Sequence, residues 1–182
     1  MEFKIEPEIF CILLTSAINA ESLNTFYQKA VPILKKADHL NLYIDSAGGQ
    51  VVVALGLARF IASLGKKVTT FTIGHCDSAA IVLFAAGHER IANAAGCQFA
   101  MHEVGIEASG IQTLASLAKI RRQLERDTNR ICAFLERRTG RASQLWQKDM
   151  ARSRRLTSAA ALRCRLATAI APVSIPARTL TI

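Results

Sequence analysis

Short apolar runs rich in β-branched residues alternate with helix-like runs along most of this chain, and this alternation limits its fold more than any other feature. The strand-like runs cover residues 10–15, 40–44, 67–73, 89–92 and 97–102. Helix-like runs over residues 20–36, 52–64 and 79–86 separate the first four of them. Two parallel strands need a crossover of a dozen or more residues, usually a helix. The alternation therefore predicts an α/β fold with a largely parallel sheet built from β-α-β units.

The longest helical run, residues 109–138, differs from the rest of the chain. Its apolar stripe has helical spacing and consists of Leu117, Ile120, Leu124, Ile131 and Leu135. A helix of about seven turns is longer than a domain of this size covers, so the stripe needs a partner, either the domain body or another subunit. Gly140 ends the run. Residues 143–149 and 157–165 read as shorter helices, and residues 171–182, which contain two prolines, as extended chain or an edge strand.

Length and composition place the chain among ordinary globular proteins. Its 182 residues suit a single domain, residues 1–182, and no apolar run is long enough to cross a bilayer. The acidic, polar start at residues 1–7 does not resemble a secretory signal. The five cysteines are odd in number and lack CxxC spacing, which argues against zinc and for reduced thiols. We therefore expect a cytoplasmic protein with no metal and no membrane association.

A net charge of +9 invites the hypothesis of a nucleic-acid partner. The distribution of the charge argues against it. The arginines concentrate on the long helix and directly after Asp149, and no aromatic residues are interleaved with them apart from Trp146 nearby. A solvated helix face or a charged contact between subunits explains them better, so we expect no nucleic-acid partner.

A serine stands where a strand-like run gives way to a helix-like run. Residues 74–78 read Gly-His-Cys-Asp-Ser, and the helix-like run begins directly after Ser78. Such a turn presents the hydroxyl above the sheet edge, and the helix N-terminus supplies N–H groups and the positive end of a dipole. That geometry suits a nucleophile whose attack creates an oxyanion. His102 and Asp149 would complete a Ser-His-Asp triad, although their order along the chain proves nothing by itself.

Two glycine-containing turns, residues 46–49 and 74–78, each follow a predicted parallel strand. Such turns meet at the carboxyl edge of a sheet, where α/β proteins bind ligands, but each turn alone is more simply a tight turn. Within the second turn, His75 and Cys76 are an alternative base and nucleophile. Adjacent residues rarely point at each other, so Cys76 reads better as a packing residue and His75 as a surface or pocket-lining residue.

In their order and spacing, these segments resemble the proteolytic subunit of the Clp protease, a ring-forming serine peptidase family within the broader crotonase-like fold. Residues 42–49 resemble a strand followed by the family's Ser-Pro-Gly-Gly, and residues 74–78 take the place of its Gly-x-Ala-Ala-Ser nucleophile turn. Residues 99–102 match the strand that bears the catalytic histidine. Residues 139–159 match the region of the aspartate and the following helix. The resemblance spans about residues 12–170.

The resemblance implies a role for each site residue. Ser78 would be the nucleophile, His102 the general base and then acid, and Asp149 the carboxylate that orients His102. The N–H groups of Gly49 and Ala79 would form the oxyanion hole. An extended peptide would lie between two segments, which are Gln50, Val51 and Val52 on one side and Val104, Gly105 and Ile106 on the other.

The resemblance also implies an assembly. Residues 104–140 would form a handle that joins two rings face to face. A peptide or unfolded-protein substrate would then be cut, without a cofactor, inside a ring-shaped homo-oligomer of one or two stacked rings. An ATP-driven unfoldase partner is less expected, because the N-terminus lacks most of the segment that forms the family's axial loops.

Several positions depart from the family pattern. Ala47 replaces a proline, Ala79 a methionine, and Asp77 an alanine directly before the nucleophile; the end of the last helix, residues 163–168, also differs. An inward-facing Asp77 carboxylate would oppose an oxyanion, whereas one that faces solvent would not. These departures favour an alternative function as a catalytically weak or inactive ring component or scaffold. An acyl-CoA enzyme on the related crotonase fold is a third candidate, and it does not require a Ser-His-Asp set.

Overall fold

The computed structural model describes residues 8–182, so the expectation about residues 1–7 lies outside the described chain. The strands are β1 (Ile9–Leu14), β2 (His39–Ser46), β3 (Lys67–Cys76), β4 (Glu89–Asn93), β5 (Gln98–Ala100), β6 (Arg155–Thr157), β7 (Ala169–Ala171) and β8 (Leu180–Thr181). The helices are α1 (Ala20–Thr25), the π-helical η1 (Phe26–Ala30), α2 (Val31–Leu34), α3 (Val51–Ser63), α4 (Ala80–Ala85), α5 (Leu114–Thr139), α6 (Ser143–Ala151) and α7 (Ser158–Arg163).

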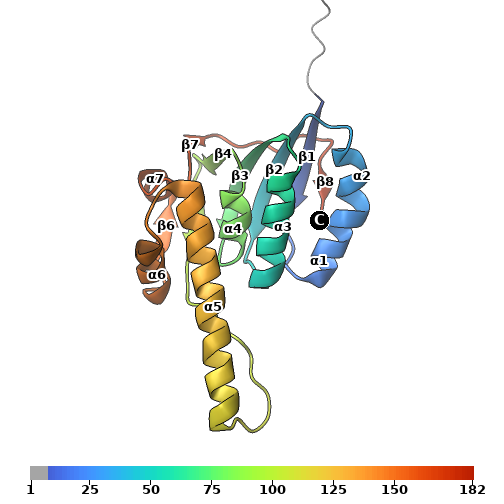
Figure 1. Cartoon of the computed structure of the whole chain (residues 1–182). Helices are drawn as coiled ribbons and strands as arrows, with labels where there is room; N and C mark the ends of the chain where they lie inside the picture. Colours follow the sequence, from blue (N-terminus) through green and yellow to red (C-terminus); the bar gives the residue numbers. More distant parts are fainter. Residues whose placement is uncertain (1–7) are drawn as a thin grey trace, which may run out of the picture.

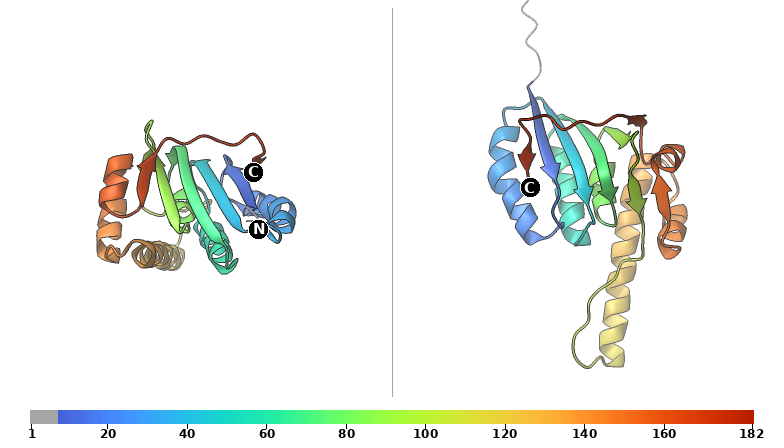
Figure 2. Two further views of the ribbon diagram at one scale, coloured as in Figure 1. Left: turned by 90° about the horizontal axis from the view of Figure 1, so that it is seen from above. Right: turned by 180° about the vertical axis from the view of Figure 1, so that it is seen from behind.

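The sheet is largely parallel, as the alternation of runs predicts. Hydrogen-bonded strands follow the order β6-β5-β3-β2-β1-β8, and β4 pairs with both β3 and β7. Among the described strands, the β5–β6 pair is antiparallel and every other pair is parallel. Helices α1 to α5 lie on one side of the sheet, and the C-terminal segment runs along the other (Figures 1 and 2). The prediction of an α/β fold is therefore confirmed.

Strand β3 changes partners along its length, and this change positions the site. Its first half pairs with β4, whereas His75 near its end pairs with Gln98 of β5. The sequence predicts that the strand ends at residue 73, but the pairing with β5 and a pairing of Cys76 with Ser46 extend it to Cys76. The segment that leads to His102 is thereby brought beside the turn that contains Ser78.

Strand β5 is shorter than its sequence predicts. It ends at Ala100, two residues before His102. The N–H of Met101 donates to the carbonyl oxygen of Arg154 (2.8 Å), and the chain leaves the sheet after this bond. His102 therefore stands on irregular chain rather than on a strand.

Helix α4 is apolar on all sides because it is buried on all sides. All six of its residues are buried, and it contacts the sheet, α3 and α5. The carbonyl groups at its C-terminal end and in the two residues after it, which no helical N–H can reach, accept hydrogen bonds from a buried arginine and a half-buried one. Arg138 donates to the carbonyls of Ala85 and Ala86, and both Arg138 and Arg90 donate to that of Gly87. The helix that begins beside Ser78 is thus fixed at its far end.

Helix α5 protrudes from the body of the molecule, as its long stripe predicts (Figure 1). It begins at Leu114, after an N-cap at Thr113, and it ends at Thr139, followed by a C-cap at Gly140, whose φ is 71°. The predicted start at residue 109 is five residues too early. Its buried residues all belong to the second half of the helix, whereas Leu114 and Leu117 are exposed (87% and 49%).

The C-terminal segment returns to the opposite edge of the sheet (Figure 2). Strand β8 pairs in parallel with β1, as the edge-strand prediction allows. This pairing covers backbone groups of β1 that would otherwise be open to another chain. Within residues 8–182, no helix combines the length and apolar character needed to span a membrane.

Candidate active site

Ser78 and His102, two of the three predicted triad residues, line the same cavity. It has a volume of about 90 Å³, and Gly49 also contributes to its wall. The remaining wall is mostly apolar and includes Ile81 of α4, Ile131 and Leu135 of α5, and Met150 of α6. The cavity therefore places a hydroxyl and an imidazole beside an apolar pocket.

Ser78 has a left-handed backbone, with φ at 53°. This conformation costs a non-glycine residue roughly 1–2 kcal/mol, so the surroundings must enforce it. The N–H of Ser78 donates to the carbonyl oxygen of Ala100 (2.8 Å), and the carbonyl of Ser78 accepts from Ile81 of α4 (3.2 Å). The turn is fixed between β5 and α4, with Ser78 in the wall of the cavity.

The turn that contains Gly48 and Gly49 accepts only glycine. A Cβ at Gly48 would lie 2.6 Å from the carbonyl oxygen of Asp77, and one at Gly49 would lie 2.3 Å from that of Ile18. Ile18 donates its N–H to Gly48 and accepts from Gln50, and this pairing turns the N–H of Gly49 away from Ile18. The turn is therefore held tightly although Ala47 stands in place of a proline.

The two predicted oxyanion donors are available for a ligand. Within residues 8–182, neither the N–H of Gly49 nor that of Ala79 donates a hydrogen bond. Ala79 directly precedes α4, so its N–H belongs to the electropositive start of that helix. Ser46 supports the neighbouring turn, because its hydroxyl accepts from the N–H of Gly48 (3.2 Å) and donates to Ser16 (2.8 Å).

The Asp77 carboxylate faces β5 rather than the cavity. Its Oδ1 accepts from the N–H of Ala100 (2.7 Å), and its Oδ2 lies 3.5 Å from Nδ1 of His75. Asp77 does not line the cavity. The carboxylate therefore takes neither of the two orientations considered from the sequence: it faces neither the cavity nor solvent, but the backbone of β5, and its side chain is only 18% exposed. Residues 77 and 78 together hold both polar groups of the Ala100 peptide, two residues before His102.

His102 has an exposed ring, and Nδ1 lies 2.7 Å from the carbonyl oxygen of Glu103. Among the hydrogen bonds of the described residues, none joins His102 to Ser78 or to Asp149. The His102 ring therefore contacts the neighbouring backbone carbonyl and not the other two residues of the predicted triad.

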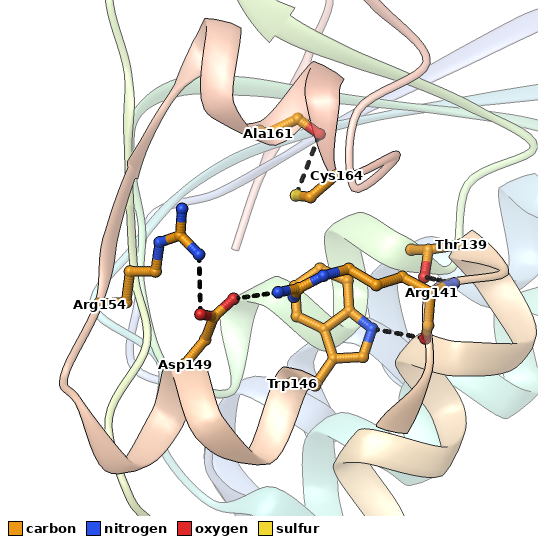
Figure 3. A network of polar contacts seen from close by, with 7 residues as sticks. All are labelled: Thr139, Arg141, Trp146, Asp149, Arg154, Ala161 and Cys164. Atoms are coloured by element: carbon orange, nitrogen blue, oxygen red, sulfur yellow. Dashed lines mark hydrogen bonds and ion pairs between the residues drawn. The ribbon is translucent and has the colours of Figure 1, made fainter. Parts of the chain in front are cut away.

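Asp149 is buried and paired with two arginines (Figure 3). Its Oδ1 lies 2.8 Å from Nη1 of Arg154, and its Oδ2 lies 2.8 Å from Nη2 of Arg141. The Arg141 guanidinium also stacks on Trp146, 4.3 Å from the ring centroid, and the Trp146 indole N–H donates to the Arg141 carbonyl (3.1 Å). The carboxylate that the sequence predicts for His102 is engaged by cations instead.

The role of these two arginines is missing from the sequence-based prediction. Arg154 follows Asp149 by five residues and Arg141 precedes it by eight, so both stand close to it along the chain. The high density of arginines in this region could have indicated partners for Asp149. The charge pattern by itself, however, favours a solvated surface or a contact between subunits.

The predicted peptide-binding segments come together. Gln50, Val51, Val52, Val104, Gly105 and Ile106 all line one groove of about 640 Å³. Gly49 lines both this groove and the cavity of Ser78. The groove and the cavity of Ser78 therefore adjoin each other.

The alternative pair of His75 and Cys76 is not supported by the geometry. Cys76 is fully buried, and burial raises the pKa of its thiol well above the usual range, which disfavours the nucleophilic thiolate. The His75 side chain is 65% exposed and faces Asp77. All five cysteines are free, and within residues 8–182 no group of His, Cys, Asp and Glu could hold a metal ion.

Known proteins share this architecture. The family model described as Clp protease matches residues 8–173. The ATP-dependent Clp protease proteolytic subunit 4 of Rhodococcus jostii is 28% identical over 131 residues, and the match covers 70% of this chain and 66% of that protein, just under two thirds of its length. A point mutant of ClpP1 from Listeria monocytogenes has the same fold with a TM-score of 0.77, at 18% identity over 90% of this chain and 91% of that one. The chain therefore belongs to the Clp protease family.

Proposed function

We propose that the chain is a serine-type endopeptidase with Ser78 as its nucleophile. One observation supports this above all: a serine in a left-handed turn shares a cavity with a histidine, beside two N–H groups that have no partner in the described chain. Each of these features serves acyl transfer, and tight packing of apolar residues requires none of them.

In the proposed reaction, the Ser78 hydroxyl attacks the carbonyl carbon of the scissile peptide bond and His102 takes its proton. The carbonyl oxygen becomes an oxyanion that accepts hydrogen bonds from the N–H groups of Gly49 and Ala79. The C–N bond then breaks, and His102 gives the proton to the leaving amine. Water, deprotonated by His102, releases the acyl group and restores Ser78. Loss of one oxyanion donor would cost about 3 kcal/mol of transition-state stabilisation.

Asp149 would stabilise the imidazolium form of His102 during this cycle. That role requires the carboxylate to exchange Arg141 or Arg154 for the histidine, since both of its oxygens lie beside guanidinium groups. Formation of the active site would therefore require the Asp149 and arginine side chains to rearrange while Ser78 stays in place.

The substrate would be an extended peptide or an unfolded segment. The groove along residues 50–52 and 104–106 offers main-chain groups from both sides, a mode that gives little side-chain selectivity. The apolar wall near Ser78, which includes Ile81, Ile131 and Leu135, fits an apolar side chain next to the scissile bond.

An assembly would enclose this site, and we propose a homo-oligomeric ring or pair of rings in the cytoplasm. The exposed start of α5, with Leu114 and Leu117, is an apolar surface that the single chain leaves uncovered. The relative from Rhodococcus jostii carries the words ATP-dependent in its name. Assistance by an ATPase is accordingly a further proposal, to be tested with the assembled protein.

A β-lactone probe with a reporter group tests the proposal. The assembled protein should become labelled, and digestion should locate the label on Ser78. The Ser78→Ala variant should remain unlabelled while it keeps the same oligomeric state. Absence of labelling in folded, assembled wild-type protein would count decisively against a serine peptidase.

A second function, a catalytically weak or inactive ring component, is favoured by the double arginine pairing of Asp149. It predicts ring assembly with a relative but no turnover by this chain alone. Peptide hydrolysis by the isolated protein, abolished in Ser78→Ala, would eliminate it.

A further inference from the structure

A recess of about 430 Å³ lies next to Asp149 and is lined by four arginines: Arg141, Arg154, Arg163 and Arg165. The rest of its wall is Gly140, Ala160 and Cys164, so no acidic side chain lines it. It shares no lining residue with the cavity of Ser78. The recess is therefore a separate, strongly basic site.

The positive charge of this recess is only partly compensated. Within residues 8–182, Asp149 is the acidic partner of both Arg141 and Arg154, whereas Arg163 and Arg165 form no ion pair. Arg165 has a φ of 62°, and its carbonyl accepts from Nη2 of Arg90 (3.1 Å), which holds this unusual conformation in place. Cations gathered in a concave surface concentrate anions there.

The pair between Arg141 and Asp149 is close but incomplete. Nη2 and Oδ2 are 2.8 Å apart, yet Oδ2 lacks a hydrogen bond of good geometry, and the buried Nη1 of Arg141 has no acceptor. A buried donor without an acceptor costs free energy, so the arrangement favours an additional acceptor or a new partner for Asp149. Stacking on Trp146 keeps the guanidinium in place whichever partner it has.

We propose that this arginine recess binds a small tetrahedral oxyanion of the phosphate type, which competes with Asp149 for Arg141 and Arg154. Guanidinium groups bind phosphate oxygens with two parallel hydrogen bonds, and four of them surround this recess. A bound anion releases the Asp149 carboxylate, which then becomes available to His102. This last step rests on the proposed peptidase function, whereas anion binding does not.

Calorimetric titration with inorganic phosphate, at constant ionic strength maintained with sodium chloride, tests the site. Arg163→Gln should weaken binding at least fivefold. Arg152→Gln removes the same charge from an exposed arginine outside the recess, and it should change the affinity less than twofold. Equal losses in the two variants, or no binding by wild-type protein, would overturn the site.

A parallel titration with adenosine monophosphate identifies the source of the oxyanion. Binding of phosphate assigns the recess to the free ion, and binding of the nucleotide alone, again lost in Arg163→Gln, assigns it to a phosphoryl group on a larger molecule. The shared chemistry stands in either case, and it fails if neither binds.

The Asp149→Asn variant tests the competition. It removes the internal anion and leaves both arginines free, so phosphate should bind roughly tenfold more tightly. Circular dichroism confirms that the variant is folded. Unchanged or weaker binding by a folded variant would overturn the competition.

Coupling to the active site has its own readout. Phosphate should speed β-lactone labelling of Ser78 several-fold in wild-type protein and leave the rate in Arg163→Gln unchanged. Equal rates with and without phosphate, in protein that does bind it, would overturn the coupling. If no labelling occurs under any condition, the peptidase proposal fails, and the two titrations still decide the recess.

Discussion

Main-chain hydrogen bonds hold the turn around Ser78 in place, whereas charged side chains hold Asp149. The turn at Ser78 is fixed by its bond to Ala100, and Gly49 by its pairing with Ile18. Asp149, in contrast, is positioned by two ion pairs to Arg141 and Arg154, of which the second side chain is 49% exposed.

The candidate site therefore has two halves, the main-chain half around Ser78 and Gly49 and the carboxylate half around Asp149, and they respond differently to their surroundings. Main-chain geometry fixed by strand pairing and tight turns persists as long as the fold persists. The Asp149 carboxylate is buried, so it needs a cationic partner at all times and can give up one guanidinium only when another positive charge takes its place. Under the proposed function, the nucleophile would be in position before substrate arrives, whereas the carboxylate would first have to change partners.

The largest effect should come from the nucleophile. Ser78→Ala removes the attacking hydroxyl, so peptide hydrolysis should fall at least about 10³-fold. The melting temperature should barely change, since the loss concerns one hydroxyl without a hydrogen bond in the described chain. If the Ser78→Ala variant hydrolysed peptides nearly as fast as wild-type protein, the turn around Ser78 would not be the site of peptide hydrolysis.

Gly49→Ala tests how strictly the main chain is fixed. The new Cβ would lie 2.3 Å from the carbonyl oxygen of Ile18, so the turn must shift. We expect a loss of about 3 kcal/mol in the free energy of unfolding and of about 10²-fold in hydrolysis, measured by urea denaturation and a peptide assay.

Gly56→Ala is the matched control. Gly56 lies within α3, and a Cβ there would meet nothing within 4 Å. This variant should gain about 0.5–1 kcal/mol of stability and keep its activity. If Gly49→Ala were as stable and as active as Gly56→Ala, the backbone geometry at Gly49 would not limit activity.

Asp77 connects the nucleophile turn to the strand before His102. Asp77→Ala removes the acceptor of the Ala100 N–H, which should reduce kcat about tenfold and leave KM nearly unchanged. Asp77→Asn keeps an acceptor oxygen and should recover most of the activity. If Asp77→Asn is as impaired as Asp77→Ala, charge rather than positioning is the role of this residue.

The smallest effect should come from the ion pairs. Arg141→Gln leaves the buried Asp149 carboxylate with Arg154 alone, and a buried charge with less compensation pairs more readily with His102, so hydrolysis should rise roughly fivefold. The melting temperature should fall, because stacking on Trp146 is lost. Arg152→Gln serves as the control for charge. Lower activity at an unchanged melting temperature would mean that Arg141 supports the active arrangement.

Sequence patterns predicted the order and type of the helices and strands better than the residues at which the strands end. The alternation of runs gave the parallel sheet, and the apolar stripe gave the protruding helix, because both depend on periodicity that the chain itself carries. The strand ends at residues 73 and 102 were wrong, since β3 gains partners in Ser46 and Gln98, and the pairing of β5 with the β6 region stops after the bond from Met101 to Arg154. These partners are distant in the sequence.

The chain by itself determined the fold class, the glycine turn at residues 48–49 and the place of Ser78, because strand periodicity and glycine conformation are local properties. Only the tertiary structure decided where the carboxylates point. Asp77 faces the Ala100 N–H and Asp149 faces two guanidinium groups, and neither follows from spacing along the chain. A carboxylate binds whichever donors the packed elements bring near it, and their positions are set by the fold as a whole.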